Sequence, residues 1–446
     1  MRRSLRHARA ALWVGAGAAL LPAGARAQGT ASERCRVQIV SVGDTGRRVE
    51  AGGQTSYFAG GGVRLRCLGQ PITMESDSVV AYASGDVEFI GRMRYRDSTM
   101  SVDADRVTYR KAGERWEARG NVLSKSVTSG STIRGPSVDY LRRAAGVRDT
   151  FEVFATGRPH VDYFARDSAS ERREPYVILA DRLHALGEDR LWGGGRVTID
   201  RSDLAARADS MRFDTGAGND GTLVGHPSFR GLGSDSFTVT GTRIDFALAG
   251  RQVHSVRAGD HAHAIKGEWD LVADTIVIGV AEHKVERMFA WGGTTRPKAV
   301  GKRYEVRGDS LAFDLPKQVL TEARAFGSAW VGGAVDSTTG NRDWMQADTI
   351  AATFAQHDSS GATRTALDVV RARHDARSFH QAKSDRPGRA PSLSYVRGDV
   401  ITLTMKKTGE EGVERVDVQG RTDGVQLEPE TASRTPAVRP APAARR

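Results

Sequence analysis

Two groups of residues in the chain have types and spacings that enzymes or metal sites use. Residues 216–221 fit the Gly-x-Gly-x-x-Gly pattern that binds a dinucleotide phosphate where a strand leads into a helix. Residues 222–225 continue as a strand, so a hairpin turn is the favoured interpretation. The same stretch also resembles one calcium-binding nonapeptide repeat, but a single copy has no stacked neighbour to complete a calcium site.

The second group is a set of histidines. His261 and His263 would share one face of a strand, with His254 nearby, and could ligate a metal ion. A solvated strand face is the favoured alternative. The sequence shows no Gly-x-Ser-x-Gly elbow, no His-Glu-x-x-His motif and no phosphate loop ending in Gly-Lys-Ser/Thr. We therefore expect no enzyme activity, no catalytic residue, no cofactor and no metal.

Carboxylates such as Asp103 and Asp105 could act as an acid and base pair, but aspartate recurs within a repeated motif. The motif reads apolar, any, Ala or Gly, Asp, any, apolar, any, and then aromatic or apolar, as in residues 102–109, 206–213 and 306–313. Recurrence about every 30 residues predicts an array of similar units that each pack on their neighbours. The ten centres are Asp77, Asp105, Ser137, Asp181, Asp209, Thr242, Asp274, Asp309, Asp348 and Asp399.

Each copy of the motif alternates with a period of two, which indicates a half-buried strand. Val102 and Ala104 share one parity, whereas Val107 and Tyr109 have the other. On a flat strand this slip would turn the second half's apolar side chains to water. Its recurrence predicts a bulge or corner at the aspartate, which can hydrogen-bond backbone groups freed there. Helical periodicity is nearly absent, so we expect an all-β, elongated, two-sheet, V-shaped jelly roll.

A second motif, Gly-x-Val-x-apolar, lies between the copies, most clearly at residues 85–89, 120–122 and 195–199. The order of both motifs from Gly53 to Val122 resembles the OstA-like family, the β-jelly-roll domains of lipopolysaccharide transport in LptA, LptC and the LptD N-terminus. The resemblance continues in degraded form to about Val425. The chain is longer than one LptA-like domain and shows no C-terminal run of barrel strands with aromatic girdles, in contrast to LptD.

This resemblance implies an apolar groove, open along one seam, that shields acyl chains while sugars stay in water. Ten residues fall on the inner parity and are candidates for the groove lining. A closed core made by the same side chains is the open alternative. The candidates are Val87, Phe89, Val107, Tyr109, Met211, Phe213, Ile244, Phe246, Leu311 and Phe313.

The two ends predict export and a loose tail. A basic head, a short apolar stretch and a small-x-small site ending at Ala27 predict a signal peptide over residues 1–27. We expect cleavage after Ala27 and a periplasmic protein, with association with the outer membrane and a retained anchor as open alternatives. We divide the rest into OstA-like repeats at 35–165, 166–300 and 301–427, a loose linker at 384–392 and a disordered basic tail at 428–446.

The charge and the cysteines agree with an exported protein that does not bind nucleic acid. The formal charge is +11, but nine arginines in residues 1–27 and from 431 onward account for most of it. A body near neutrality lacks the basic surface of a nucleic-acid binder. Cys35 and Cys67 are the only two cysteines, and in an exported chain they most simply form one disulfide.

Three functional hypotheses follow. The first is a periplasmic lipid or lipopolysaccharide transport or outer-membrane assembly component. It would hold acyl chains and contact other OstA-like or Lpt proteins by stacking of sheet edges. The second is a carbohydrate-active β-helix enzyme, and the third is a ligand-free structural scaffold of the envelope.

Overall fold

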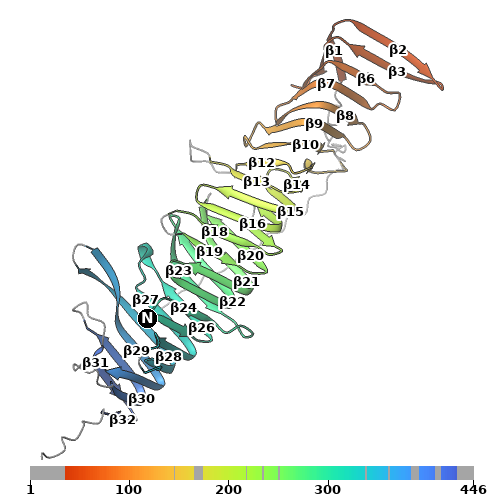
Figure 1. The fold of residues 1–446 in the computed structure, drawn as a ribbon. Helices are drawn as coiled ribbons and strands as arrows, with labels where there is room; N and C mark the ends of the chain where they lie inside the picture. Colours follow the sequence, from red (N-terminus) through yellow and green to blue (C-terminus); the bar gives the residue numbers. More distant parts are fainter. Residues whose placement is uncertain are drawn as a thin grey trace, which may run out of the picture.

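The described strands form a long β structure in which every ladder is antiparallel (Figure 1). The computed structural model describes residues 36–144, 146–164, 174–216, 218–233, 236–249, 252–336, 339–359, 362–382, 391–406 and 413–428. The predicted signal peptide, Cys35, nearly all of the predicted linker and almost all of the tail lie outside these residues. The expected fold class, an elongated all-β jelly roll, is confirmed.

The strands follow one another along the body in chain order. The first ten are β1 (Arg36–Val42), β2 (Thr45–Ala51), β3 (Gln54–Gly60), β4 (Val63–Leu68), β5 (Thr73–Ser76), β6 (Ser78–Ala81), β7 (Val87–Arg96), β8 (Met100–Arg110), β9 (Arg115–Ser126) and β10 (Thr132–Leu141). The next twelve are β11 (Glu152–Thr156), β12 (His160–Tyr163), β13 (Tyr176–Leu179), β14 (Arg182–Leu186), β15 (Arg190–Arg201), β16 (Leu204–Asp214), β17 (Asp220–Val224), β18 (Ser228–Gly231), β19 (Phe237–Thr240), β20 (Arg243–Ala249), β21 (Gln252–Lys266) and β22 (Trp269–Ala281).

The C-terminal part contains the longest strands. They are β23 (Lys284–Trp291), β24 (Lys298–Val300), β25 (Tyr304–Arg307), β26 (Ser310–Asp314), β27 (Glu322–Gly333), β28 (Trp344–Ser359), β29 (Ala362–Ala382), β30 (Ser392–Met405), β31 (Val413–Gln419) and β32 (Asp423–Leu427). One 3-10 turn, η1 (Pro316–Gln318), is the only helical element among the described residues, and it is too short to cross a membrane.

The sheet is folded lengthwise into two walls that meet along a ridge. The first wall contains β1, β4, β5, β12, β13, β18, β19, β24, β25 and β32, and the second wall contains β2, β3, β6, β11, β14, β17, β20, β23, β26 and β31. Each of the other strands is long enough to run through both walls. Opposite the ridge, the hairpin turns of each wall form a rim, and the space between the two rims is the mouth.

A two-against-one bulge makes each corner of the ridge. Between β15 and β16, Gly194 faces Ser210 and Val197 faces Ala208, so Gly195 and Arg196 together oppose the single residue Asp209. The same shift occurs between β7 and β8, β21 and β22, β27 and β28, and β29 and β30. The extra residue restores the inward parity beyond the bend, as the parity slip in the sequence predicted.

Seven corner aspartates also contact a glycine of the neighbouring strand, whereas Asp348 is opposed by His374 and Asp375 instead. A Cβ atom placed on that glycine would lie 2.1–2.5 Å from the aspartate side chain, which is shorter than the distance to which a Cβ atom approaches a non-bonded atom. In six of these glycines φ is between +71° and +87°, a region that disfavours other residues. The seven pairs are Asp77 with Gly91, Asp105 with Gly120, Asp181 with Gly195, Asp209 with Gly225, Asp274 with Gly292, Asp309 with Gly327 and Asp399 with Gly420.

The corner carboxylates accept hydrogen bonds mostly from the side chain that follows the glycine. Arg92 donates to Asp77 at 2.7 Å, and Asn121 donates to Asp105 at 2.8 Å. Asp274 instead accepts from two backbone N–H groups, as the sequence led us to expect of every corner. The Arg92 hydrogen bond lowers the pKa of Asp77, but both side chains are exposed, so solvent weakens the pairing.

One centre of the motif is wrong by one residue. Ser137 pairs regularly with Arg119 and Thr156, whereas Pro136 is the unpaired residue of that corner. A Cβ atom on Gly157 would lie 2.4 Å from the Pro136 ring. Proline at this corner forgoes the hydrogen bond that the backbone N–H of Asp77, Asp181 and Asp209 donates to the carbonyl of the paired glycine.

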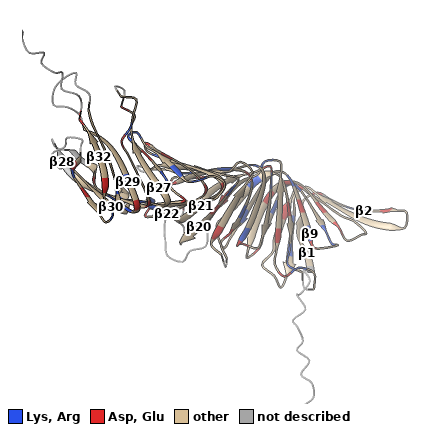
Figure 2. Ribbon diagram, turned by 90° about the horizontal axis from the view of Figure 1, so that it is seen from below, with Lys and Arg blue, Asp and Glu red and all other residues tan. Residues whose placement is uncertain are grey.

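The core is a single strip of inward side chains from both walls, running from Val63 to Ile401. The small residues that precede the corner aspartates, such as Ala104 and Ala273, are buried there, where the walls are closest. Charged residues of both signs are mixed along the outside (Figure 2). The fold therefore leaves its apolar groups between the walls and at its two ends.

We expect the glycine of a corner to resist substitution for two separable reasons. Gly195→Ala adds backbone strain at φ +79° and a collision with Asp181, whereas Gly113→Ala adds only strain at φ +84° because nothing lies within 4 Å. Gly259→Ala adds neither. Denaturant unfolding should show a loss of about 1–2 kcal/mol for Gly113→Ala, more for Gly195→Ala, and within about 0.5 kcal/mol for Gly259→Ala. Equal losses at Gly195 and Gly113 would contradict the paired corner.

Candidate functional site

The space between the two walls is the candidate site, because the ten predicted lining residues all turn toward it. Eight of them are buried, and Val87 and Tyr109 are partly buried. Burial alone does not separate a groove from a closed core, since both place the same parity inward. The cavities between the walls distinguish the two, and they differ along the body.

The middle of the body is filled by its own side chains. Phe246 contacts Phe213 and Phe229 with ring centroids 5.9 and 5.8 Å apart, and Tyr176 packs edge-on against Phe213. The space left among these rings is about 10 Å³, too little for a water molecule. The nearby Ile244 is fully buried. This part is a closed core.

A buried ion pair in the first rim and a partly exposed histidine in the second join the two rims over that closed core. Asp203, in the turn between β15 and β16 of the first rim, pairs with Arg201, and its carboxylate lies 2.9 Å from Nδ1 of His283 in the second rim. The Arg201 guanidinium lies over the Tyr176 ring, 4.5 Å from its centroid. Only 6% of the Arg201 side chain and 13% of the Asp203 side chain are exposed. We call these residues the rim clasp.

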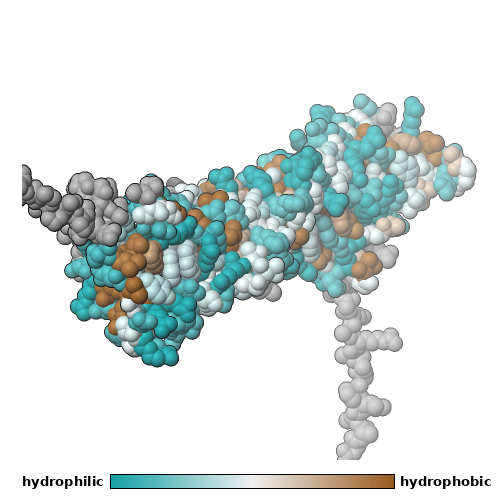
Figure 3. Space-filling model, turned by 60° about the horizontal axis from the view of Figure 1, so that its bottom comes forward, coloured by the Kyte–Doolittle hydropathy of each residue, from teal (hydrophilic) through white to brown (hydrophobic). Residues whose placement is uncertain are grey.

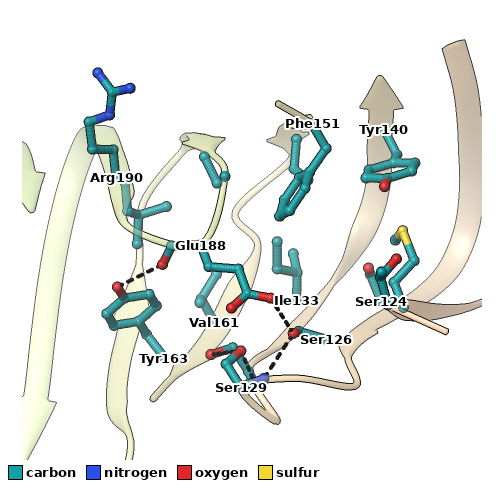
Figure 4. A pocket seen from close by; sticks show the side chains of 17 residues that line it. Ser124, Ser126, Ser129, Ile133, Tyr140, Phe151, Val161, Tyr163, Glu188 and Arg190 are labelled. Atoms are coloured by element: carbon teal, nitrogen blue, oxygen red, sulfur yellow. Dashed lines mark hydrogen bonds between the residues drawn. The ribbon is translucent and has the colours of Figure 1, made fainter. Parts of the chain in front are cut away.

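Toward the N-terminal end, a small pocket of about 100 Å³ opens between the rims (Figure 4). Ile133, Phe151 and Val161 form its apolar floor, and hydroxyl groups of the first rim form its edge. We call it the serine pocket. Its hydroxyl residues are Thr99, Ser124, Ser126, Ser129, Ser131, Tyr140 and Tyr163.

Hydrogen bonds across the serine pocket tie the rims together. The Ser126 hydroxyl donates to the Glu188 carboxylate at 3.2 Å, and the Tyr163 hydroxyl donates to the Glu188 carbonyl at 3.2 Å. Tyr163 also lies 2.6 Å from the Thr215 hydroxyl. Burial raises the pKa of Tyr163 to about 12, so it stays neutral and keeps its proton. These groups are occupied in holding the walls rather than arranged around a nucleophile.

Beyond the rim clasp, a larger cavity of about 360 Å³ opens at the mouth. Trp269, Leu271 and Ala299 of the first wall face Met288, Phe313 and Leu320 of the second wall across it. An adjoining apolar pocket on its C-terminal side shares Trp269, Phe313 and Leu320 and continues to Phe354 and Leu367. We call the two together the tryptophan cavity. Of the ten predicted lining residues, only Phe313 borders this space.

Apart from Tyr304 in the adjoining pocket, the polar side chains of the tryptophan cavity lie at its opening. Ser236, Lys266 and Glu268 come from the first rim, and Gln318 comes from η1 in the second rim. Lys266 has the inward parity of Ala262 and Ala264, both 1% exposed, so its side chain borders the cavity. Burial lowers the pKa of Lys266.

The residues considered for other chemistry are not brought together. His261 lies in a ridge corner at φ +59°, while His263 turns outward and contacts Asp270 at 3.0 Å. Among the described residues no group of three His, Cys, Asp or Glu could hold a metal ion. Gly216 and Gly218 lie in the connection between the antiparallel strands β16 and β17, and Gly221 lies in β17, as the hairpin interpretation required.

Cys67 is buried in β4 and is disulfide-bonded. Its expected partner Cys35 lies outside the described residues, so the pairing stays a proposal. Val37, two residues along the chain from Cys35, faces Cys67 in the ladder between β1 and β4.

The sequence interpretation missed Trp269, Lys266, Leu320 and the rim clasp. Lys266 and Trp269 carried a signal, since both share the parity of buried neighbours on β21 and β22. Asp203 and His283 carried none, because they meet only through the way the two walls twist around each other.

Comparison with known proteins gave partial likenesses to solved structures only. No protein-family model and no curated protein matches the chain. Among solved structures, LptH from Pseudomonas aeruginosa, described as the LptA-homologous periplasmic component of the lipopolysaccharide transport device, is 18% identical. The match covers 28% of this chain and 94% of LptH, with a TM-score of 0.25. These values do not identify the family or the ligand of this chain.

We predict that the rim clasp links stability to acid pH. Burial of Asp203 opposes its charge, but the Arg201 hydrogen bond and the charges of Arg201 and His283 lower its pKa overall. A lowered pKa gives stability that is complete above the ordinary value of 3.8 and is lost as pH falls through the lowered one.

Asp203→Asn should therefore destabilise the protein by roughly 1–3 kcal/mol at pH 7 and flatten the stability curve below pH 3.8. Asp200→Asn is the control, because its pair with Arg207 is exposed. Denaturant unfolding at a series of pH values measures both. An unchanged acid slope in Asp203→Asn would rule out the linkage.

Proposed function

We propose that this protein is a non-enzymatic component of lipid or lipopolysaccharide transport in the cell envelope, which holds acyl chains between its walls. The tryptophan cavity is the observation that carries the proposal. Its lining is mostly apolar, its charged residues lie at the opening, and its volume is within the roughly 300–1,000 Å³ of sites that bind small molecules.

Open sheet edges support partners of the same architecture. Within the described strands, β1 and β2 pair on one side only, and so do β31 and β32. Apolar side chains remain exposed at both ends, including Ile39 and Val425. An unpaired edge with exposed apolar groups is a template for strand addition. We propose that other OstA-like or Lpt proteins continue the walls at these edges.

The location in the periplasm is part of the same proposal. It rests on the signal-peptide pattern that ends at Ala27, on the cysteine pair and on the resemblance of the two motifs to the OstA-like family. In LptH, the described role is that of a periplasmic component of lipopolysaccharide transport. Association with the outer membrane and cleavage after Ala27 belong to the proposal as well.

Of the two rival functions, one disagrees with the structure. A β-helix enzyme stacks parallel coils, whereas every ladder between the described strands is antiparallel. A ligand-free scaffold is favoured by the filled interior at Phe213 and Phe246. That observation applies to the middle of the body and leaves the tryptophan cavity for a ligand.

We predict that a photo-crosslinking residue at Phe313 captures lipid in cells. Phe313 borders the tryptophan cavity, whereas the next residue, Ala312, has the outward parity of β26. Crosslinker at position 312 is the matched control and should capture little lipid. Crosslinker at Phe213 should also capture little, because the rings around it leave about 10 Å³. Equal capture at 312 and 313, or none at 313, would contradict lipid binding at this site.

A further inference from the structure

We propose that the tryptophan cavity is a site for one acyl chain whose carboxylate or phosphate head is held at the opening by Lys266. The inference rests on the proposed function and narrows it from a groove for lipids in general to a site with a fixed capacity and head-group charge. It also places the site in a limited part of the body rather than along its whole length.

The capacity follows from the volume. At about 30 Å³ for a group the size of a water molecule, a cavity of about 360 Å³ holds about twelve heavy atoms. That is one acyl chain of medium length and not a bundle of chains. The filled rings at Phe213 and Phe246 bound the cavity toward the N-terminal end, so chains cannot share one continuous trough. Figure 3 shows apolar atoms gathered on the C-terminal part of the body.

The direction of the chain follows from where the polar groups lie. Lys266, Ser236 and Glu268 lie on the first rim, while the adjoining pocket toward the C-terminal end is bordered by apolar side chains such as Phe354 and Leu367. An acyl chain therefore lies with its tail toward the adjoining pocket and its head beside Lys266. Lys266 is the cation among the residues that border the cavity. Its positive charge attracts a negative head group placed at the opening.

The volume and the charge predict two trends in affinity. Each added methylene should tighten binding about fourfold until the chain has about twelve carbons, after which the affinity should level off. The substitution Lys266→Met should lower the affinity for a fatty acid by at least about tenfold. It should leave the affinity for the uncharged methyl ester unchanged. Lys284→Met is the matched control, because Lys284 is exposed and lies outside the cavity.

Quenching of tryptophan fluorescence tests where the chain binds. The full-length protein without detergent is titrated with stearate brominated at mid-chain, with its methyl ester and with brominated phosphatidylglycerol. Bromine on the bound chain should quench the tryptophan emission, and the quenching should saturate at one chain per protein. Trp269→Phe should remove the quenched component, and Trp192→Phe should keep it, because Trp192 stacks on His184 outside the cavity. Quenching by stearate or by phosphatidylglycerol identifies a free fatty acid or a bilayer lipid as the source.

Three results would overturn the inference: several chains per protein, quenching that survives in Trp269→Phe, or equal losses for stearate and its ester in Lys266→Met. Each can occur while crosslinker at Phe313 still captures lipid, in which case the proposed function stands and only the single-chain site is wrong. If neither crosslinking nor quenching is seen, both fail. Circular dichroism of every variant separates a lost site from a lost fold.

Discussion

The close approach between a corner aspartate and a left-handed glycine on the next strand is the constraint on which this structure depends. At each corner, two residues of one strand oppose one residue of its neighbour, which bends both strands and returns their apolar side chains to the inside. A Cβ atom has no room beside the aspartate. The bend therefore requires a glycine opposite the aspartate, as in the pair of Asp181 and Gly195. Repeating the pair along the chain folds one sheet into two walls.

The distance between the walls then decides what the interior can do. In the middle of the body, large rings and the rim clasp bring the walls together, and no space for a ligand remains. Near the C-terminal end, small residues such as Ala299 and Ala325 face the interior, and the tryptophan cavity opens. The same corner geometry thus supports a closed core and a binding site. Side-chain size within the strip selects between them.

Much of this architecture could be predicted from the sequence, and the particular residues show why. The parity slip between Ala104 and Val107 predicted a corner at Asp105, because alternation reports directly which side of a strand faces the core. The glycine motif was recognised but not paired with the aspartates, since pairing depends on strand register. The corner at Pro136 was missed because the motif was defined by aspartate. Proline occupies the same unpaired position in the ladder but has no carboxylate.

The candidate site was less predictable than the fold. Inward parity marks Phe213 and Phe313 alike, yet one lies in a filled core and the other borders a cavity. The difference arises from the residues across the mouth, which come from strands distant in the sequence. Lys266 could have been found, since a charged residue at an inward position among alanines contradicts the pattern around it. The contact between Asp203 and His283 depends on the twist of the walls, which no local pattern encodes.

The most direct test of the account is native mass spectrometry of the full-length protein purified from cell envelopes without detergent. The account predicts a population with one bound acyl-chain lipid, and the loss of that population when Leu320→Trp fills the tryptophan cavity. Val319→Trp, in the adjacent position outside the cavity, should retain it. A protein that carries no lipid, and takes up none when incubated with envelope lipids, would contradict the claim that its walls exist to hold acyl chains.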